Sequence, residues 1–240
     1  MSESPTQPSR AQRALYFAAA FAVALAVFVP MGFVRLIVRD EGFYLLASEM
    51  VMANRLPYLD FFYTQTPAMP YLYGGWIEIF GHTWVAARMF SAVLASATGA
   101  LLFVACTRRE GLRFGAVGLS LYLLSDVVLC WYSVVKSYAL VTFLLFAAFV
   151  AVQARSTLRP WAMPLAAGFC LGLAVNVRLI VVVAVPVLLL VLVALLAAAR
   201  LLKLLGVTGT NVVTRVLGML LAALAAQFII DGLRQAFALG

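Results

Sequence analysis

The sequence predicts an all-α, polytopic integral membrane protein: a helical bundle of about six to seven transmembrane helices, with short interfacial helices in the first extracytoplasmic loop. Hydrophobic residues make up 65% of the 240 residues, and charged residues make up only 11%. The mean hydropathy of +1.06 agrees, since soluble domains are about half apolar and about a quarter charged. The net charge of +8 comes from basic residues that stand singly or in pairs between apolar runs. That pattern is typical of cytoplasmic loops and argues against a nucleic-acid partner.

The N-terminal segment is predicted to be a cytoplasmic tail followed by a signal anchor. Residues 1–13 are polar and contain two prolines, so we expect a disordered tail. Residues 14–34 form an apolar run that is long for the core of a cleaved signal peptide, and no small-residue cleavage site followed by a soluble domain comes after it. Arg10 and Arg13 precede this run. We therefore expect the N-terminus to lie in the cytoplasm.

Residues 35–84 are predicted to form the first extracytoplasmic loop. Asp40 is expected to cap a helix over residues 41–54, because a carboxylate accepts hydrogen bonds from the free amides of a first turn. Pro57 is expected to end this helix. A second apolar stretch, residues 71–80, is too short to span a bilayer, so an interfacial or re-entrant helix is expected there.

The later apolar runs are expected to cross the membrane in alternating directions. They cover residues 84–106, 114–132, 137–152, 161–177, 179–199 and 212–230. Under this topology most Lys and Arg residues outside the first loop lie on one side, in agreement with the positive-inside rule. Only residues 176–178 separate two of the runs, which leaves open a helical hairpin or a kink. Arg178, at that point, is expected either to pair with an acidic group or to hold phosphate.

The stretch of residues 39–62 is where we expect the function. It follows the first apolar run directly and holds four of the chain's nine acidic residues, namely Asp40, Glu41, Glu49 and Asp60. Aromatic residues are frequent in the same stretch, whereas the remainder of the chain is largely apolar. An acidic, aromatic cluster beside a membrane span suits chemistry at the membrane surface.

An ordered series of short motifs runs through this region. It consists of Asp40-Glu41-Gly42-x-Tyr44, Leu56-Pro57-Tyr58-x-Asp60-Phe61-Phe62, Tyr71-Leu72-Tyr73, Phe80-Gly81 and Ala86-Ala87-Arg88. On a polytopic background, residues 14–185 resemble the glycosyltransferase C superfamily. The nearest relatives would be bacterial dolichyl-phosphate-mannose protein mannosyltransferase-like enzymes of the family 39 type and aminoarabinose transferase-like enzymes. The chain departs from that family in carrying Thr66 where a Lys often precedes the proline, and in being shorter, with fewer spans.

The resemblance implies a transferase of the bacterial inner (plasma) membrane. Such an enzyme moves a hexose or pentose from a polyprenyl-phosphate donor to a lipid, glycan or protein acceptor outside the cytoplasm. Asp40 takes the role of catalytic base, or orients the acceptor, with Glu41 beside it, since displacement at an anomeric carbon needs a carboxylate near the acceptor hydroxyl. The resemblance further implies substrate-binding roles, including guanidinium contacts to phosphate, for Arg39, Tyr44, Arg55, Asp60, Arg88 and Lys136.

Several of these residues also have a plainer explanation that the sequence leaves open. Asp40 can be a helix cap only, and Asp60 can be a turn residue. Asp126 and Lys136, near the outer ends of neighbouring runs, either pair with each other or leave Lys136 to hold phosphate. His82 is the single histidine and makes a poor metal site by itself. No metal ligands are predicted, although His82 is open to joining acidic residues around a divalent ion.

Residues 204–233 carry a second pattern, with Leu205-Gly206-x-x-Gly209 before Arg215, an apolar helix, and then Gln227-Phe228-x-x-Asp231-Gly232-Leu233. This stretch resembles the last segment of the MarC family of bacterial inner-membrane proteins. It sets residues 186–240 apart from the transferase-like residues 14–185, as in a fused, rearranged or shortened chain. It also implies an alternative function: a non-enzymatic, transporter-like membrane protein, or an inactive fusion.

Overall fold

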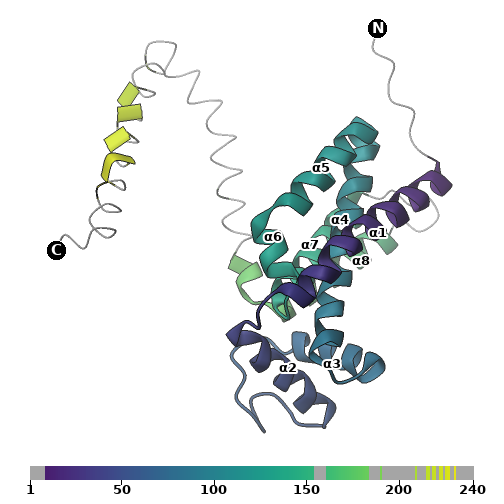
Figure 1. Ribbon diagram of the computed structural model, residues 1–240, viewed down its shortest axis with the longest axis vertical. Helices are drawn as coiled ribbons and strands as arrows, with labels where there is room; N and C mark the ends of the chain where they lie inside the picture. Colours follow the sequence, from purple (N-terminus) through teal and green to yellow (C-terminus); the bar gives the residue numbers. More distant parts are fainter. Residues whose placement is uncertain are drawn as a thin grey trace. The chain divides into compact units, whose positions relative to one another are not determined.

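The computed structural model describes residues 9–153 and 161–183, together with single positions farther along the chain. The chain divides into two compact units, Met1–Val182 and Val183–Gly240. The elements described in the first unit are all helices (Figure 1), which confirms the predicted all-α class. In the second unit, single positions such as Arg215 and Gln227 are helical. The helices are α1 (Arg10–Val34), α2 (Arg39–Met52), α3 (Ala68–Phe80), α4 (Trp84–Glu110), α5 (Leu112–Leu124), α6 (Asp126–Tyr132), α7 (Ser137–Gln153) and α8 (Ala162–Val177).

The first helix, α1, begins at Arg10, four residues before the predicted apolar run. Ser9 and Gln12 form a capping box: the Ser9 hydroxyl accepts a hydrogen bond from the Gln12 amide at 3.2 Å, and the Gln12 side chain accepts one from the Ser9 amide at 2.8 Å. This reciprocal contact satisfies two amides at the helix start. The polar residues before the apolar run therefore extend the helix. Residues 1–8 of the predicted tail lie outside the described residues.

Helices α1 and α4 pack against each other in an antiparallel arrangement. The rings of Tyr16 and Phe103 lie 6.2 Å apart near one end of the pair. Ala20 and Ala100 share a buried cluster farther along, and a Cβ on Gly32 would lie 3.4 Å from the Met89 side chain at the other end. Small residues let two helix backbones approach closely. Such close packing drives helix association within lipid, where the hydrophobic effect gives no driving force.

The predicted span over residues 114–132 is not one straight helix. Helices α5 and α6 are bent by 63° at a short break. Ser125, between them, has extended backbone angles of φ −69° and ψ 116° and ends α5, and Asp126 then opens α6 in its first turn. Apolar residues stand on both sides of the polar Ser125 and Asp126, so an argument from apolar runs joins the two helices into one span. A carboxylate at the start of α6 is favourable, because a helix N-terminus carries partial positive charge.

The number of spans is lower than predicted among the residues that the structure describes. Two helices, α1 and α4, are long and apolar enough to cross a membrane, and the bent pair α5–α6 makes a third if it is one span. Helices α7 and α8 are apolar but have only 17 and 16 residues, against about 20 for a full crossing. The count of six to seven is therefore not supported here. The predicted runs 179–199 and 212–230 lie mostly outside the described residues.

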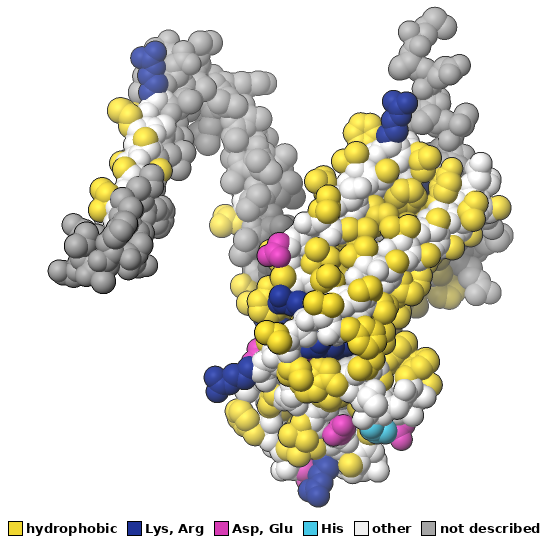
Figure 2. All heavy atoms as spheres, in the orientation of Figure 1, with side chains coloured by type: hydrophobic (Ala, Val, Ile, Leu, Met, Phe, Trp, Pro, Cys, Tyr) yellow, Lys and Arg dark blue, Asp and Glu magenta, His cyan; other side chains and the backbone are white. Residues whose placement is uncertain are grey.

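The outer surfaces of the long helices are apolar. Large side chains such as Val23, Phe33 and Leu121 are exposed on them, and Figure 2 shows hydrophobic side chains spread along their visible faces. A soluble domain rarely exposes apolar area on this scale. Most of the acidic side chains and the histidine visible in Figure 2 gather instead toward the end that carries α2 and α3. This distribution fits helices in lipid with a polar end outside it.

Helices α2 and α3 form a cap at one end of the long helices (Figure 1); we use "cap" for these two helices and the residues between them. They cross closely at Gly74, where an added Cβ would lie 2.9 Å from the Ser48 carbonyl oxygen and 2.8 Å from the Met52 side chain. The α3 helix begins at Ala68, three residues before its predicted start. Pro67 stands at its N-cap, where the missing amide hydrogen of a proline costs nothing.

The prediction that Asp40 is the N-cap residue of α2 is wrong. The N-cap residue is Val38, and Asp40 lies within the first helical turn. Glu41 makes the capping contact, because its Oε2 accepts a hydrogen bond from the Val38 amide at 2.9 Å. A glutamate three residues after the N-cap can reach back in this way, whereas an aspartate one residue earlier cannot. Asp40 is thereby left free to point away from the helix start.

Candidate functional site

Asp40 and Lys136 form an ion pair at the cap end of the bundle. The Lys136 Nζ lies 3.0 Å from Asp40 Oδ2. The Asp40 side chain is 55% exposed, whereas that of Lys136 is 10% exposed. The Lys136 ammonium also lies 4.5 Å from the ring centre of Trp131, a favourable cation–π contact. The structure therefore brings together two of the predicted site residues, and Lys136 pairs with Asp40 rather than with Asp126.

The backbone of residues 133–136 holds Lys136 in place. This segment joins α6 to α7, and side chains of three other helices form hydrogen bonds with its backbone. The Ser91 hydroxyl donates to the Val134 carbonyl at 2.9 Å, Tyr73 donates to the Lys136 carbonyl at 3.2 Å, and the Val135 amide donates to Glu41 Oε1 at 2.8 Å. Because these anchors come from α2, α3 and α4, the position of Lys136 depends on the packing of the cap against α4.

Glu41 and Arg88 form a second ion pair, which is buried. Arg88 Nε lies 3.0 Å from Glu41 Oε1, and Nη2 lies 2.6 Å from Oε2, so the pair is bidentate. The other guanidinium hydrogens are donated to backbone carbonyls at the end of α1 and just after it, those of Gly32, Arg35 and Leu36. Both charged groups have their hydrogen-bonding capacity met, as burial requires. The geometry gives Glu41 and Arg88 a structural role. The predicted catalytic role of Glu41 and the predicted phosphate contact of Arg88 stay predictions.

Arg178 follows α8 and lies against the Tyr138 ring. Its guanidinium carbon is 4.7 Å from the Tyr138 ring centre, and its Nη1 donates to the Ser137 hydroxyl at 3.1 Å. Lys136 is 5.9 Å from the same ring. Two cations thus share one aromatic side chain. No carboxylate lies within ion-pair distance of Arg178 among the described residues.

A groove of about 380 Å³ runs beside Arg178. Its wall consists of Tyr58, Thr64, Gln65, Thr66, Leu179 and Ile180 in addition to Arg178. Gln65 connects this groove to α2, because its amide nitrogen donates to the Tyr44 hydroxyl at 2.6 Å. Thr66, which stands where relatives of the resembled family often carry Lys, donates to the Val175 carbonyl at 3.4 Å. The groove therefore offers a guanidinium, an amide and hydroxyls within one recess.

The charges of Asp40, Lys136 and Arg178 all act on Tyr44. Its pKa is raised above the ordinary value of 10, first by burial and then by the Asp40 carboxylate, while the hydrogen bond from Gln65 and the charges of Arg178 and Lys136 oppose the rise. The phenol consequently stays protonated at neutral and mildly alkaline pH. A protonated phenol can donate a hydrogen bond to an anionic or hydroxylated ligand.

The other predicted binding residues lie elsewhere on the cap. Arg39 and Arg55 are exposed. Asp60 Oδ2 accepts a hydrogen bond from the Leu56 amide at 2.7 Å, which closes the turn after α2 and matches its plainer explanation. His82 Nε2 lies 3.1 Å from Glu78 on the surface. Among the described residues, no three His, Cys, Asp or Glu side chains come together as metal ligands.

Sequence reasoning missed three residues that shape this site: Gln65, Trp131 and Tyr138. Aromatic residues near the ends of apolar runs are typical membrane-interface anchors, and nothing in their spacing separates those that contact a cation. Gln65 has no motif of its own. Its proximity to Tyr44 arises only from folding of the loop between α2 and α3, across 21 residues of sequence.

The fold and the site together define an integral membrane protein with helical spans and a polar cap. Comparison with known families gives a match of residues 147–237, less than half of the chain, to the MarC family of integral membrane proteins. This match includes the predicted MarC-like stretch 204–233 and extends toward the N-terminus. No curated protein and no solved structure matches the chain. The comparisons support a membrane protein, and they give no support to the resemblance of residues 14–185 to glycosyltransferases.

Proposed function

We propose that the Asp40–Lys136 site carries out a group transfer at the membrane surface, with Asp40 as the general base. One observation carries the proposal: of the two adjacent carboxylates, Glu41 is buried in its pair with Arg88, whereas Asp40 is exposed beside Lys136. One carboxylate thus anchors the helix and the other faces outward. A base must be within reach of the proton that it removes.

The finer proposal is a glycosyltransferase that takes a sugar from a polyprenyl-phosphate donor. The acceptor hydroxyl oxygen attacks the anomeric carbon of the sugar, and its proton passes to the Asp40 carboxylate. The bond from the anomeric carbon to the phosphate oxygen breaks, and the polyprenyl phosphate leaves with the electron pair. In this proposal Lys136 and Arg178 hold the phosphate, because ammonium and guanidinium groups pair with its oxygens. The acceptor is a lipid, a glycan or a protein on the extracytoplasmic face.

The decisive test compares Asp40→Asn with Glu49→Gln in membrane vesicles. Glu49 is an exposed carboxylate on the same helix and serves as the matched control. The vesicles are given undecaprenyl phosphate carrying a radiolabelled hexose or pentose, and label in the acceptor fraction is counted against the amount of inserted protein. We expect Asp40→Asn to lose transfer at least 100-fold with an unchanged protein level, and Glu49→Gln to keep it. Equal transfer by all three proteins would exclude Asp40 as the base.

A second candidate function is a non-enzymatic membrane protein related to the MarC family. The match over residues 147–237 favours it, and the family comparison supports it better than it supports the transferase. This function predicts that a cellular phenotype follows the C-terminal polar residues, such as Arg215 and Gln227, and ignores Asp40. Complementation of a deletion strain separates the two: rescue by Asp40→Asn but not by Arg215→Ala with Gln227→Ala would favour the second function.

A further inference from the structure

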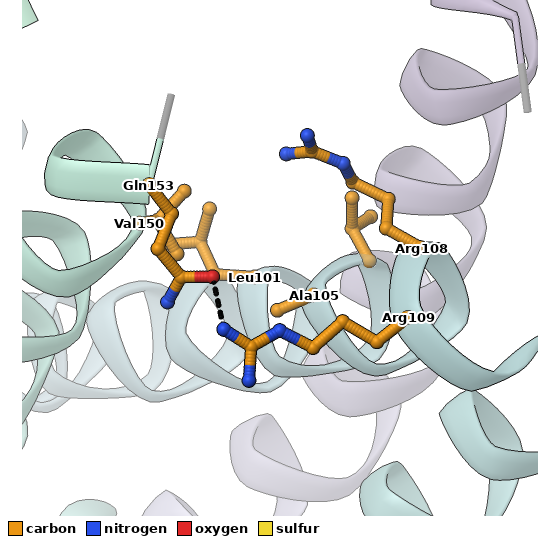
Figure 3. A pocket seen from close by; sticks show the side chains of 7 residues that line it. Leu101, Ala105, Arg108, Arg109, Val150 and Gln153 are labelled. Carbon is orange, nitrogen blue, oxygen red and sulfur yellow. Dashed lines mark hydrogen bonds between the residues drawn. The ribbon is translucent and has the colours of Figure 1, made fainter. Parts of the chain in front are cut away.

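A second recess lies away from the cap, between the final turns of α4 and α7. Its volume is about 160 Å³. Its lining contains Arg108, Arg109 and Gln153 together with apolar side chains that include Leu101, Ala105 and Val150 (Figure 3). The site is therefore amphiphilic, because it combines two cations with an apolar lining. Neither the Asp40 site nor the family match accounts for it.

The two arginines are held differently. Arg109 is fixed in place: its Nη2 donates to Gln153 Oε1 at 2.6 Å, and its guanidinium lies 5.9 Å from the ring centre of Phe149. Arg108, one residue earlier, projects separately from α4 and forms no hydrogen bond with the other residues that line the recess (Figure 3). Within the described part of the chain, neither arginine forms an ion pair with a carboxylate. Both positive charges are thus available to an anion.

The surroundings indicate which anion fits. The floor consists of side chains of α4 and α7, two apolar helices whose neighbouring surface carries exposed hydrophobic residues such as Phe149 and Val152. A free phosphate gains nothing from such a floor, whereas the acyl chain of a lipid can pack against it. Basic pockets at the ends of membrane helices suit anionic lipid headgroups, and each nearby Lys or Arg strengthens binding about fivefold.

We propose that this recess binds an anionic phospholipid of the phosphatidylglycerol type. Its phosphodiester lies between Arg108 and Arg109, and the first part of an acyl chain packs on Leu101, Ala105 and Val150. Gln153 positions Arg109 for the headgroup. Because α4 and α7 run side by side from the cap to this point, the lipid adds a further link between helix ends that the Arg109–Gln153 hydrogen bond and the Arg109–Phe149 contact already join.

The proposal is tested by thermal unfolding and native mass spectrometry of the full chain in detergent. Dioleoyl phosphatidylglycerol is compared with dioleoyl phosphatidylcholine, and free glycerol 3-phosphate is added in a third arm. The test variant is Arg108→Gln with Arg109→Gln, and the control is Arg113→Gln, which removes an exposed arginine just beyond the recess. A second variant, Ala105→Leu, keeps both charges but fills the floor.

The expected result is that phosphatidylglycerol binds the original protein and Arg113→Gln equally, and binds the double variant about 25-fold more weakly. Ala105→Leu also weakens it, and phosphatidylcholine and glycerol phosphate have no such effect. Undiminished phosphatidylglycerol binding by the double variant would overturn the proposal. So would equal binding of the two phospholipids, or an equal effect of glycerol phosphate, which would indicate a site for free phosphate. If the double variant fails to fold, unchanged binding by Ala105→Leu overturns the proposal by itself.

Discussion

Arg88 Nη2 lies 2.6 Å from Glu41 Oε2 although 47 residues separate them in the chain, and both side chains are nearly inaccessible to solvent. The pair connects four parts of the protein: the end of α1, the start of α2, the start of α4 and the segment before α7. Removing one member leaves the other charge buried and alone, which is far more costly than the pair itself is stabilising.

We therefore expect Arg88→Ala to lower the free energy of unfolding by about 3–5 kcal/mol. The measurement is thermal unfolding of purified protein in detergent, with the amount of membrane-inserted protein as a second readout. Arg55→Ala, which removes an exposed arginine of the cap, should change stability by no more than about 0.5 kcal/mol. Similar losses for the two variants would show that the buried pair does not organise the cap.

Replacing the two adjacent carboxylates should change stability to very different extents. Asp40→Asn removes a pair that is half exposed on the Asp40 side, so stability should change by no more than about 1 kcal/mol. Glu41→Gln leaves Arg88 without its counter-charge and should destabilise strongly. Unfolding midpoints of the two variants, measured side by side, test this. A midpoint for Asp40→Asn as low as that for Glu41→Gln would mean that Asp40 is structural, and the proposed base would be lost.

The sequence predicts where the long helices begin, but not how they bend or which residues of different helices come into contact. The predicted starts of α4 at Trp84 and of α7 at Ser137 are confirmed, because each follows a polar or turn-forming stretch and opens a sustained apolar run. The bend at Ser125 was missed, since hydropathy does not register one extended residue. Asp40 was singled out on sequence grounds, but its ion partner was not, because contact with Lys136 depends on how distant helices pack rather than on local spacing.

Tyr63 offers a test at alkaline pH. Its side chain is buried, its hydroxyl has no hydrogen-bond partner among the described residues, and burial raises its pKa well above 10. Unfolding exposes the phenol, which then ionises near pH 10, whereas the buried phenol of the folded protein stays protonated. The free energy of unfolding is therefore unaffected by this ionisation below pH 10 and falls as the pH rises above it. Tyr63→Phe should raise stability by about 1 kcal/mol at neutral pH and reduce the loss above pH 10. A steeper alkaline loss in the variant would contradict the assignment.

Two neighbouring glycines of α3 form a matched pair for testing the α2–α3 crossing. A Cβ at position 74 would lie 2.9 Å from the Ser48 carbonyl oxygen, a backbone atom that cannot turn aside, whereas nothing lies within 4 Å of a Cβ at position 75. Gly74→Ala should therefore destabilise by about 1–3 kcal/mol. Gly75→Ala should be neutral or stabilise by up to about 1 kcal/mol, because alanine favours a helix over glycine. Chemical unfolding of both variants checks this, and equal outcomes would mean that the helices do not approach so closely.

The long sequence separations in the cap also have a consequence for synthesis. Glu41 meets Arg88 after 47 further residues and Val135 after 94. At about 5–20 residues per second, the ribosome makes Arg88 about 2–9 seconds after Glu41 and Val135 about 5–19 seconds after it. During that interval the nascent chain carries a carboxylate that must stay in water, at the very place where the first helix leaves the lipid. The carboxylate can be buried only after α4 has been inserted, because α4 carries Arg88. Assembly of the cap is therefore coupled to the insertion of α4.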